Sequence, residues 1–243
     1  MSDTVEKTRN GAILYDTDII DQISERAFTA NGWPVVEPVK GVLRSAGRGN
    51  TLFVSDGKHQ FVLRHYIRGG LPGRLIRDSY VWLGERQTRS FTEWHLLARL
   101  NALGLPVPRP AAARYCHLGP FYTADLLTIR LPDIRSLADR IAERPGDEKF
   151  WRNLGAELHR FHQAGVYHAD LNAYNLQIGQ DDKMFLLDFD RGKIMSPGQW
   201  KQKNIARLHR SLRKIRQAHD SIHFSAADWE QFLQAYFSAS RSA

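Results

Sequence analysis

Two acidic residues and an asparagine in the second half of the chain have the types and spacing that phosphate-transfer chemistry needs. The segment HADLNAYN places Asp170 two residues after His168 and five residues before Asn175. A carboxylate at the first position can accept the proton of an attacking hydroxyl, and an amide oxygen at the second can hold Mg²⁺ against phosphates. Asp188, in the later segment LLDFD, supplies another hard oxygen ligand at the end of an apolar run.

Each of these motifs alone also fits a plain structural role, as a buried turn-capping aspartate or a surface loop residue. Together, in this order and after a helix ending in HQAG, they match the catalytic loop H-x-D-L-x-x-x-N and the D-F-G metal ligand of kinases. We therefore predict Asp170 as the catalytic base and Asn175 and Asp188 as Mg²⁺ ligands. Asp190 stands where D-F-G has glycine, and for His168 we favour support of the loop backbone over a role as general base.

Four residues in the first half of the chain are the predicted ATP-binding set. Gly47 and Gly49 lie between two strand candidates, where a glycine-rich loop can cover phosphates, although a plain hairpin turn explains them equally well. Arg64 ends the strand candidate FVLR, at the place of the lysine in V-A-I-K, and its guanidinium keeps the charge with a different geometry. Glu93, on the following helix, is the expected ion-pair partner of Arg64, with a solvated glutamate as the alternative.

The elements that position these residues fall into a strand-rich first part and a helical second part. The Asp56-Gly57 pair predicts a hairpin between strands, and apolar residues at helical spacing predict a helix over 90–103. We expect an α+β, bilobal protein-kinase-like fold with an N-terminal extension (1–38), an N-lobe (39–132) and a C-lobe (133–243). The expected strands cover 39–43, 51–55, 59–66, 112–116 and 121–129, and the other expected helices cover 18–28, 136–144, 149–163, 199–218 and 226–238.

Composition narrows the class of protein. Hydrophobic residues make up 42% and charged residues 25% of the 243 residues, which is typical of a folded globular chain. The single cysteine, Cys116, excludes an intrachain disulfide and a cysteine-based zinc site. The sequence has no apolar run of the roughly 18 residues that a membrane span requires, and its polar N-terminus does not resemble a signal peptide. We therefore expect a cytoplasmic protein.

The charge of the chain predicts an anionic partner. The formal net charge is +8, and the stretch from Arg191 to His219 holds nine Lys or Arg and no acid. A second stretch, from Arg64 to Arg89, holds six arginines. Solvated helix faces are the alternative explanation of both stretches.

The stretch 39–237 resembles the 3-deoxy-D-manno-octulosonic acid (Kdo) kinase family, which is related to the lipopolysaccharide heptose kinases. The resemblance rests on GRG at 47–49, LRHYIRGGL at 63–71, the E-x-x-L-L-x-x-L run from Glu93, HADLNAYN and LLDFDRG. It implies transfer of the γ-phosphate of ATP, with Mg²⁺, to the 4-hydroxyl of Kdo on Kdo-lipid IVA during lipopolysaccharide core biosynthesis. It also implies that Asp170 is the active-site acid, that Arg64 is a family trait, and that the enzyme is peripheral on the cytoplasmic face of the bacterial inner membrane.

Basic residues fit this setting. The predicted helix 199–218 can pack one apolar stripe on its lobe and present Arg207, Arg210 and Lys214 to anionic lipid headgroups. A second group of arginines can bind phosphates or the carboxylate of the acceptor: Arg68, Arg74 and Arg77.

Departures from the kinase pattern leave alternatives open. Asn172 replaces the catalytic-loop lysine of many protein kinases, so Arg191 or Lys193 is expected to neutralise the transferred phosphoryl group. The sequence has no A-P-E motif, which disfavours a long activation loop and a protein substrate. A heptose kinase and a membrane-binding pseudokinase remain the alternatives. We expect no nucleic-acid partner and no obligate protein partner.

Overall fold

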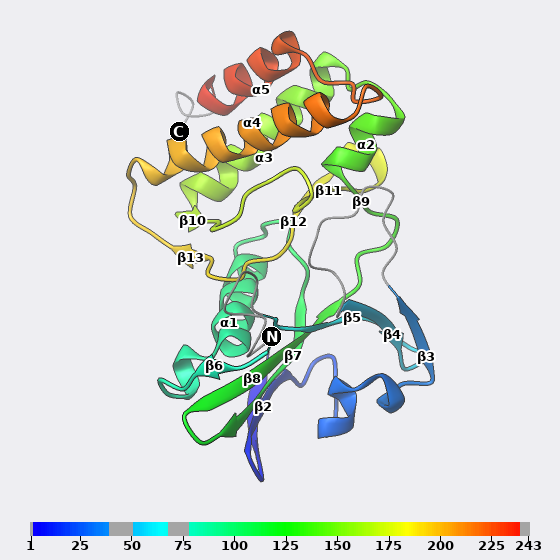
Figure 1. The fold of residues 1–243 in the computed structure, drawn as a ribbon, viewed down its shortest axis with the longest axis vertical. Coiled ribbons are helices and arrows are strands. Elements are labelled where there is room, and N and C mark those ends of the chain that lie inside the picture. The colour runs from blue at the N-terminus through cyan, green and yellow to red at the C-terminus, as the bar shows by residue number, and fades with distance from the viewer. Residues whose placement is uncertain (1, 39–50, 68–77, 239–243) are drawn as a thin grey trace. The chain divides into compact units, whose positions relative to one another are not determined.

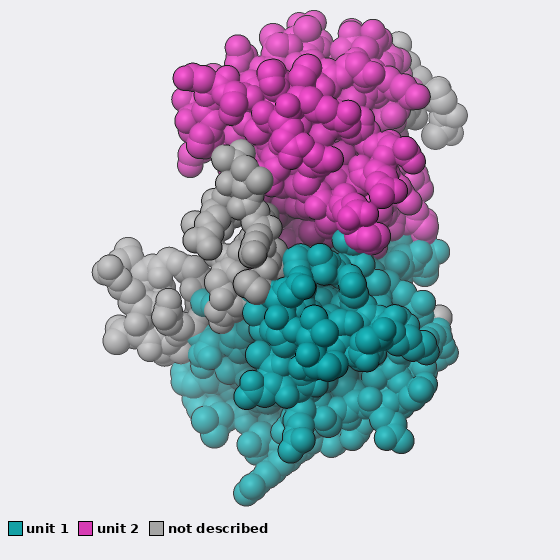
Figure 2. Space-filling model, turned by 90° about the vertical axis from the view of Figure 1, so that its right-hand side faces the viewer, with its two compact units in different colours: residues 1–40, 44–102, 108–131 teal, residues 41–43, 103–107, 132–243 magenta. Residues whose placement is uncertain are grey.

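The structure is a computed structural model that describes residues 2–38, 51–67 and 78–238 (Figure 1). The chain divides into two units (Figure 2). Unit 1 comprises Met1–Lys40, Arg44–Ala102 and Pro108–Leu131, and unit 2 comprises Gly41–Leu43, Leu103–Val107 and Pro132–Ala243. Several predicted features lie outside the described residues: the strand 39–43, Gly47, Gly49, Arg68, Arg74 and Arg77.

Unit 1 is built on an antiparallel sheet in which strands distant in sequence become neighbours. The strand order is β1-β2-β7-β8-β5-β4-β3, and β6 pairs with β8. The predicted Asp56-Gly57 turn joins β4 to β5, where Gly57 has a φ of +91°, a conformation that glycine adopts without strain. The strands are β1 (Asp3–Thr8), β2 (Gly11–Asp16), β3 (Val35–Pro38), β4 (Thr51–Ser55), β5 (Gln60–His65), β6 (Tyr80–Val81), β7 (Pro110–Leu118) and β8 (Phe121–Ile129).

The main helix of unit 1, α1 (Arg89–Ala102), contacts β7 and β8. Its predicted apolar stripe is buried: Phe91, Trp94, Leu97 and Leu100 are each at most 2% exposed. Glu93 is also buried, at 3% exposure. A carboxylate in this position needs partners inside the unit, because burying an unpaired charge is costly.

The predicted helix over 18–28 is wrong. Only a short 3₁₀ helix, η1 (Glu25–Phe28), forms there, and a second, η2 (Ala30–Gly32), follows. Ile19, Ile20 and Ile23 instead pack against the core of the sheet from an irregular segment. The first forty residues also contribute β1, β2 and β3 to the sheet, which the sequence patterns did not predict.

Unit 2 is mostly helical, as predicted, and its helices begin at residues suited to capping them. The Ser136 hydroxyl accepts the Asp139 N–H at the start of α2, and the Asp147 carboxylate accepts the Phe150 N–H at the start of α3. The helices are α2 (Leu137–Glu143), α3 (Glu148–Gln163), α4 (Trp200–Ala218) and α5 (Ala226–Ser238). The short strands are β9 (Arg135–Ser136), β10 (Val166–Tyr167), β11 (Leu176–Ile178), β12 (Met184–Leu186) and β13 (Lys193–Ile194).

Helix α4 has the two faces that its sequence predicted. Ile205, Leu208, Leu212 and Ile215 are buried on one side, at 7% exposure or less, while charged residues such as Arg210 lie exposed on the other. No helix among the described residues has the length and apolar character of a membrane span. The predicted α+β class, with a strand-rich N-terminal part and a mostly helical C-terminal part, is confirmed.

Candidate functional site

A short antiparallel hairpin brings two of the predicted site residues to one place in unit 2. Strand β11 pairs with β12 with Leu176 opposite Leu186, and the Leu187 N–H donates to the carbonyl oxygen of Asn175 at 2.9 Å. Asn175 directly precedes β11 and Asp188 directly follows Leu187. Because the strands are antiparallel, both side chains therefore start from the same end of the hairpin.

The loop before this hairpin places Asp170 beside Asn175. The side-chain Nδ2 of Asn175 donates to the carbonyl oxygen of Asp170 at 2.9 Å. Asn172 also reaches back, and its Nδ2 donates to the Asp170 carbonyl at 3.1 Å and to Asp170 Oδ2 at 3.0 Å. The carboxylate of Asp170 is thus held from one side by an amide, while the residue as a whole is exposed. The structure thus places Asp170 beside Asn175, with Asp188 one residue beyond the strand end that bonds to Asn175, and their roles in catalysis and metal binding stay predictions.

Asn172 shapes the catalytic loop. Its Oδ1 accepts the backbone N–H groups of Tyr174 at 2.8 Å and Asn175 at 3.1 Å, which is an Asx-turn arrangement. In the sequence, Asn172 stands where many protein kinases have the catalytic-loop lysine. In the structure it is a positioning residue, since its amide connects the backbone of the turn to the carboxylate of Asp170.

His168 ties the loop to the strand that carries Asp188. It is 1% exposed, its Nε2 lies 2.9 Å from the carbonyl oxygen of Leu187, and its Nδ1 accepts the Asp170 N–H at 3.2 Å. This pattern requires a neutral ring with its proton on Nε2. Burial lowers the pKa of His168, although the bond to Leu187 opposes the shift. Both ring nitrogens face backbone groups, which agrees with the supporting role favoured from the sequence.

Helix α4 holds the same loop from behind through two polar residues that the sequence analysis missed. Asn204 is 1% exposed, and its amide accepts the His168 N–H at 3.2 Å and donates to the His168 carbonyl at 2.9 Å. Seven residues later, the Ser211 hydroxyl oxygen accepts the Ala173 N–H at 3.2 Å. The available signal was the spacing of these two polar residues on a helix whose inner face is otherwise apolar.

Asp188 has a strained backbone. Its φ is +62°, in the left-handed region, which costs a residue with a side chain about 1–2 kcal/mol. Such strain persists where surrounding contacts fix it, and it is common at functional sites. Here the preceding residue, Leu187, bonds to Asn175 through its N–H and to His168 through its carbonyl oxygen. The following residue, Phe189, is 1% exposed, and its ring lies 5.0 Å from that of His168.

The donors at this end of the hairpin fit Mg²⁺. Because Asn175 Nδ2 is bonded to the Asp170 carbonyl, its Oδ1 is the atom left for a cation, and Asp188 adds a carboxylate. Mg²⁺ is commonly held by one or two such oxygen ligands together with phosphates and water. Within the described parts of the chain no group of three or more His, Cys, Asp or Glu side chains is arranged to hold a metal.

Unit 1 contains the predicted ion pair of Arg64 and Glu93. Arg64 Nη2 lies 2.5 Å from Glu93 Oε2, and the Tyr66 hydroxyl donates to the same oxygen at 2.6 Å. Arg64 also donates to the Tyr66 hydroxyl at 2.9 Å, so the three groups form a closed triangle. The arrangement fixes the guanidinium while leaving the Arg64 side chain 23% exposed. Sequence reasoning missed Tyr66, which is part of the LRHY segment.

The neighbouring His65 belongs to a second ionic cluster in unit 1. Its Nδ1 lies 2.7 Å from Asp125 Oδ1, and its Nε2 lies 3.5 Å from Asp78 Oδ2. Arg114 donates twice to the other oxygen of Asp125, at 3.0 and 2.8 Å. The hydrogen bond to Asp125 raises the pKa of His65, although burial opposes the shift. This cluster joins β5, β7 and β8 to Asp78, which lies two residues before β6, and it gives His65 a structural role.

Comparison with known proteins gives consistent matches. The lipopolysaccharide kinase (Kdo/WaaP) family matches residues 37–236. A 3-deoxy-D-manno-octulosonic acid kinase of Vibrio parahaemolyticus is 41% identical over 205 residues, covering 84% of this chain and 85% of that protein. A 3-deoxy-D-manno-octulosonic acid kinase of Xanthomonas euvesicatoria is 43% identical over 208 residues, covering 85% of this chain and 82% of that protein.

A solved structure also matches over most of the chain. It is the bifunctional kinase-methyltransferase WbdD, with a TM-score of 0.47 and 15% sequence identity. The match covers 86% of this chain and 47% of WbdD, so the chain spans about half the length of that protein.

Proposed function

Because the chain belongs to the lipopolysaccharide kinase (Kdo/WaaP) family, we propose that it transfers the γ-phosphate of ATP to the 4-hydroxyl of Kdo on Kdo-lipid IVA. Membership of this family makes the chain a kinase, and the resemblance noted in its motifs is confirmed. The acceptor follows the printed names of the relatives, which are Kdo kinases. The observation that carries the chemistry is the grouping of Asp170, Asn175 and Asp188 at one end of the β11–β12 hairpin.

In this proposal Asp170 accepts the proton of the sugar hydroxyl. The Asn172 amide donates to Asp170 Oδ2, which orients the carboxylate and leaves Oδ1 for the hydroxyl proton. Asn175 and Asp188 would hold Mg²⁺, which neutralises charge on the phosphates when it is bound. His168 and Asn204 do not touch the reacting groups in this scheme. They hold the catalytic loop in place against α4 and against the strand end at Leu187.

ATP binding is proposed for unit 1. Arg64 is held by Glu93 and Tyr66, so its guanidinium is preorganised to donate to a phosphate without losing further side-chain freedom. Gly47 and Gly49 remain proposed contributors through their backbone N–H groups. Arg191 and Lys193, both exposed, are the proposed cations in place of a catalytic-loop lysine.

Attachment to the cytoplasmic face of the inner membrane is proposed from charge. Arg210 and Lys214 lie exposed on α4, opposite its buried stripe, and Arg207 is half-buried. Basic residues near an anionic membrane surface contribute about 1 kcal/mol each. A chain of net charge +8 with such a helix is suited to reversible binding at a surface.

The test is phosphate transfer from radiolabelled ATP to Kdo-lipid IVA, with a heptosylated acceptor beside it and Asp170→Asn as the matched control. We expect label on the Kdo acceptor that is lost in the variant. If only the heptosylated acceptor is labelled, the chain is still a kinase, but its acceptor is a heptose and not Kdo. Binding of ATP and Mg²⁺ in a thermal-shift assay without transfer to either acceptor would contradict the proposed reaction and favour the pseudokinase alternative.

A further inference from the structure

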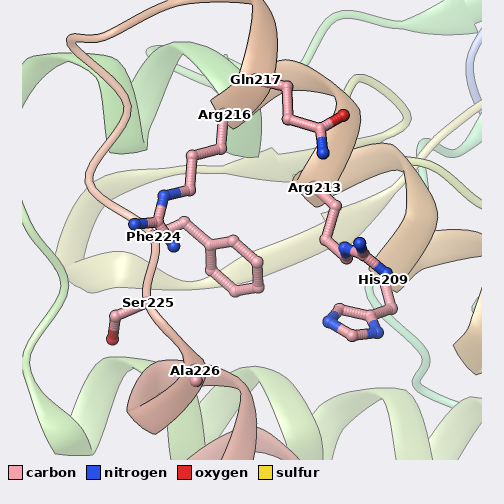
Figure 3. A pocket seen from close by; sticks show the side chains of 7 residues that line it. All are labelled: His209, Arg213, Arg216, Gln217, Phe224, Ser225 and Ala226. Atoms are coloured by element: carbon pink, nitrogen blue, oxygen red, sulfur yellow. The ribbon is translucent and has the colours of Figure 1, made fainter.

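A cavity of about 430 Å³ opens between the C-terminal half of α4 and the segment that leads into α5, entirely within unit 2 (Figure 3). Its lining comes from two elements of different character. Helix α4 supplies polar and cationic side chains, and the segment before α5 supplies an aromatic ring and small residues. The lining residues are His209, Arg213, Arg216, Gln217, Phe224, Ser225 and Ala226.

The cationic side of this cavity follows from helix periodicity. His209, Arg213 and Arg216 are spaced by four and then three residues, so they share one face of α4. Like charges on one face repel each other, and α4 contains seven Lys or Arg and no acidic residue to offset them. Among the described residues neither Arg213 nor Arg216 forms an ion pair with a carboxylate.

The segment before α5 gives the cavity an apolar wall. Phe224 is 6% exposed and its ring lies 5.5 Å from that of Trp151, which is itself buried. His209 is stacked on Trp229 at 4.4 Å with the rings 3° from parallel. Figure 3 shows the Phe224 ring between Arg216 on one side and Arg213 and His209 on the other. The cavity therefore has an aromatic wall whose ring packs against the buried Trp151.

The carboxylate of Asp228, two residues after the lining residue Ala226, is already engaged. Asp228 accepts the hydroxyl of Ser225 at 2.7 Å and its backbone N–H at 2.8 Å, so it caps α5 from within. A second cavity, of about 480 Å³, differs in its charge, because Asp147 and Glu148 line it together with Lys149 and Arg152. Only the cavity at α4 thus combines two unpaired guanidinium groups with an apolar wall among the described cavities.

We propose that this cavity is a binding site for the phosphate group of an anionic ligand, separate from the catalytic loop. Guanidinium groups bind phosphate through paired, charge-assisted hydrogen bonds, and two of them on one helix face can hold a single phosphate between them. The Phe224 ring provides contact area for the carbon atoms next to that phosphate. The ligand is therefore a phosphate or phosphate ester, from a lipid headgroup or from solution.

His209 gives a direct reading of occupancy. Burial lowers the pKa of His209, and the positive charge of Arg213 lowers it further. A bound anion beside Arg213 reverses the second effect, so occupancy raises this pKa. The side-chain resonances of His209, identified by their loss in His209→Gln, can follow the change by nuclear magnetic resonance in the full chain.

The experiment titrates two probes at constant ionic strength: inorganic phosphate, and dihexanoyl phosphatidylglycerol below the concentration at which it forms micelles. We expect the His209 pKa to rise and reach a plateau as probe is added. In Arg213→Gln/Arg216→Gln we expect the affinity for the probe to be about tenfold lower or weaker still. The charge-matched control, Lys149→Gln/Arg152→Gln on α3, is expected to bind as the unchanged protein does.

The two probes distinguish the sources of the ligand. If inorganic phosphate saturates the site, the phosphate group alone is sufficient for binding. If only the lipid saturates it, binding also requires the contact between the carbon atoms of the lipid and Phe224. The proposal is overturned if neither probe gives a saturable response, or if the response is equal in Arg213→Gln/Arg216→Gln, or if the α3 control loses it to the same degree.

Discussion

Replacing Asn204 by leucine tests whether α4 positions the catalytic loop. The side chains are similar in size, but leucine removes both hydrogen bonds to the backbone of His168, which are 3.2 and 2.9 Å long. An unpaired buried polar group costs about 1–3 kcal/mol. Because two such groups are left on a buried residue, we expect a loss of about 2–5 kcal/mol in the free energy of unfolding.

The effect on catalysis is expected to exceed the effect on binding. His168 sits two residues before Asp170 and bonds to the strand end that carries Asp188, so a shift of its backbone moves the base relative to the metal ligands. Misplacement of reacting groups by about 1 Å can cost 10²-fold in rate. We expect kcat to fall about tenfold or more, while KM for ATP changes much less, since Arg64 and Glu93 are in the other unit.

Asn101→Leu is the matched control. Asn101 is a half-buried asparagine that, like Asn204, makes two hydrogen bonds to backbone, here to the carbonyls of Leu97 and Pro108, but it lies in unit 1. Thermal unfolding and steady-state kinetics should show that both variants lose stability and that only Asn204→Leu loses kcat. A fall in kcat of the same size in both, or an unchanged kcat in Asn204→Leu, would refute the positioning role.

Three further changes test other parts of the account. Asp188→Asn is expected to raise the Mg²⁺ concentration for half-maximal activity about tenfold or more, because a neutral amide replaces the charged ligand; an unchanged Mg²⁺ titration would contradict its assignment. The pKa of His65 is raised by Asp125 in the folded protein, so its stabilisation is complete below the unfolded pKa and is lost as pH rises through the folded value. The difference in melting temperature between the unchanged protein and His65→Gln should therefore decrease as pH rises from about 6 to 9. A difference that stays constant over this range would refute the effect. Gly155→Ala is expected to destabilise the chain by about 1–3 kcal/mol in urea unfolding, since the added Cβ would lie 2.1 Å from the carbonyl oxygen of Phe232; stability equal to that of the unchanged chain would show that α3 and α5 can separate without cost.

The sequence alone was sufficient for the core of the candidate site because its residues are close along the chain. Asp170, Asn172 and Asn175 belong to one loop, and Asp188 follows the same hairpin, so spacing within a few residues determines how they meet. The amphipathic helices were predicted for the same reason. The apolar period of α4 and α5 is a local property, and α5 begins and ends at the predicted residues.

Local patterns failed where distant segments decide the outcome. The spacing of Ile19, Ile20 and Ile23 resembles a helix, but these side chains pack on a sheet core that includes residues from β7 and β8. The β1–β2 hairpin has little alternation to reveal it, because all of β1 is exposed or half-buried while β2 is almost entirely buried against β7. Tertiary burial outweighed local propensity in both segments.

The sequence by itself determined the family and the class of chemistry, and it predicts which residues carry the reaction. The tertiary structure decided how those residues are held and where the chain forms a cavity. Asn204 and Ser211 reach the loop across separations of 36 and 38 residues, and the cavity of Arg213 and Arg216 needs the chain to turn back before α5. Such pairings depend on how buried polar groups find partners in three dimensions, and neither composition nor periodicity records that.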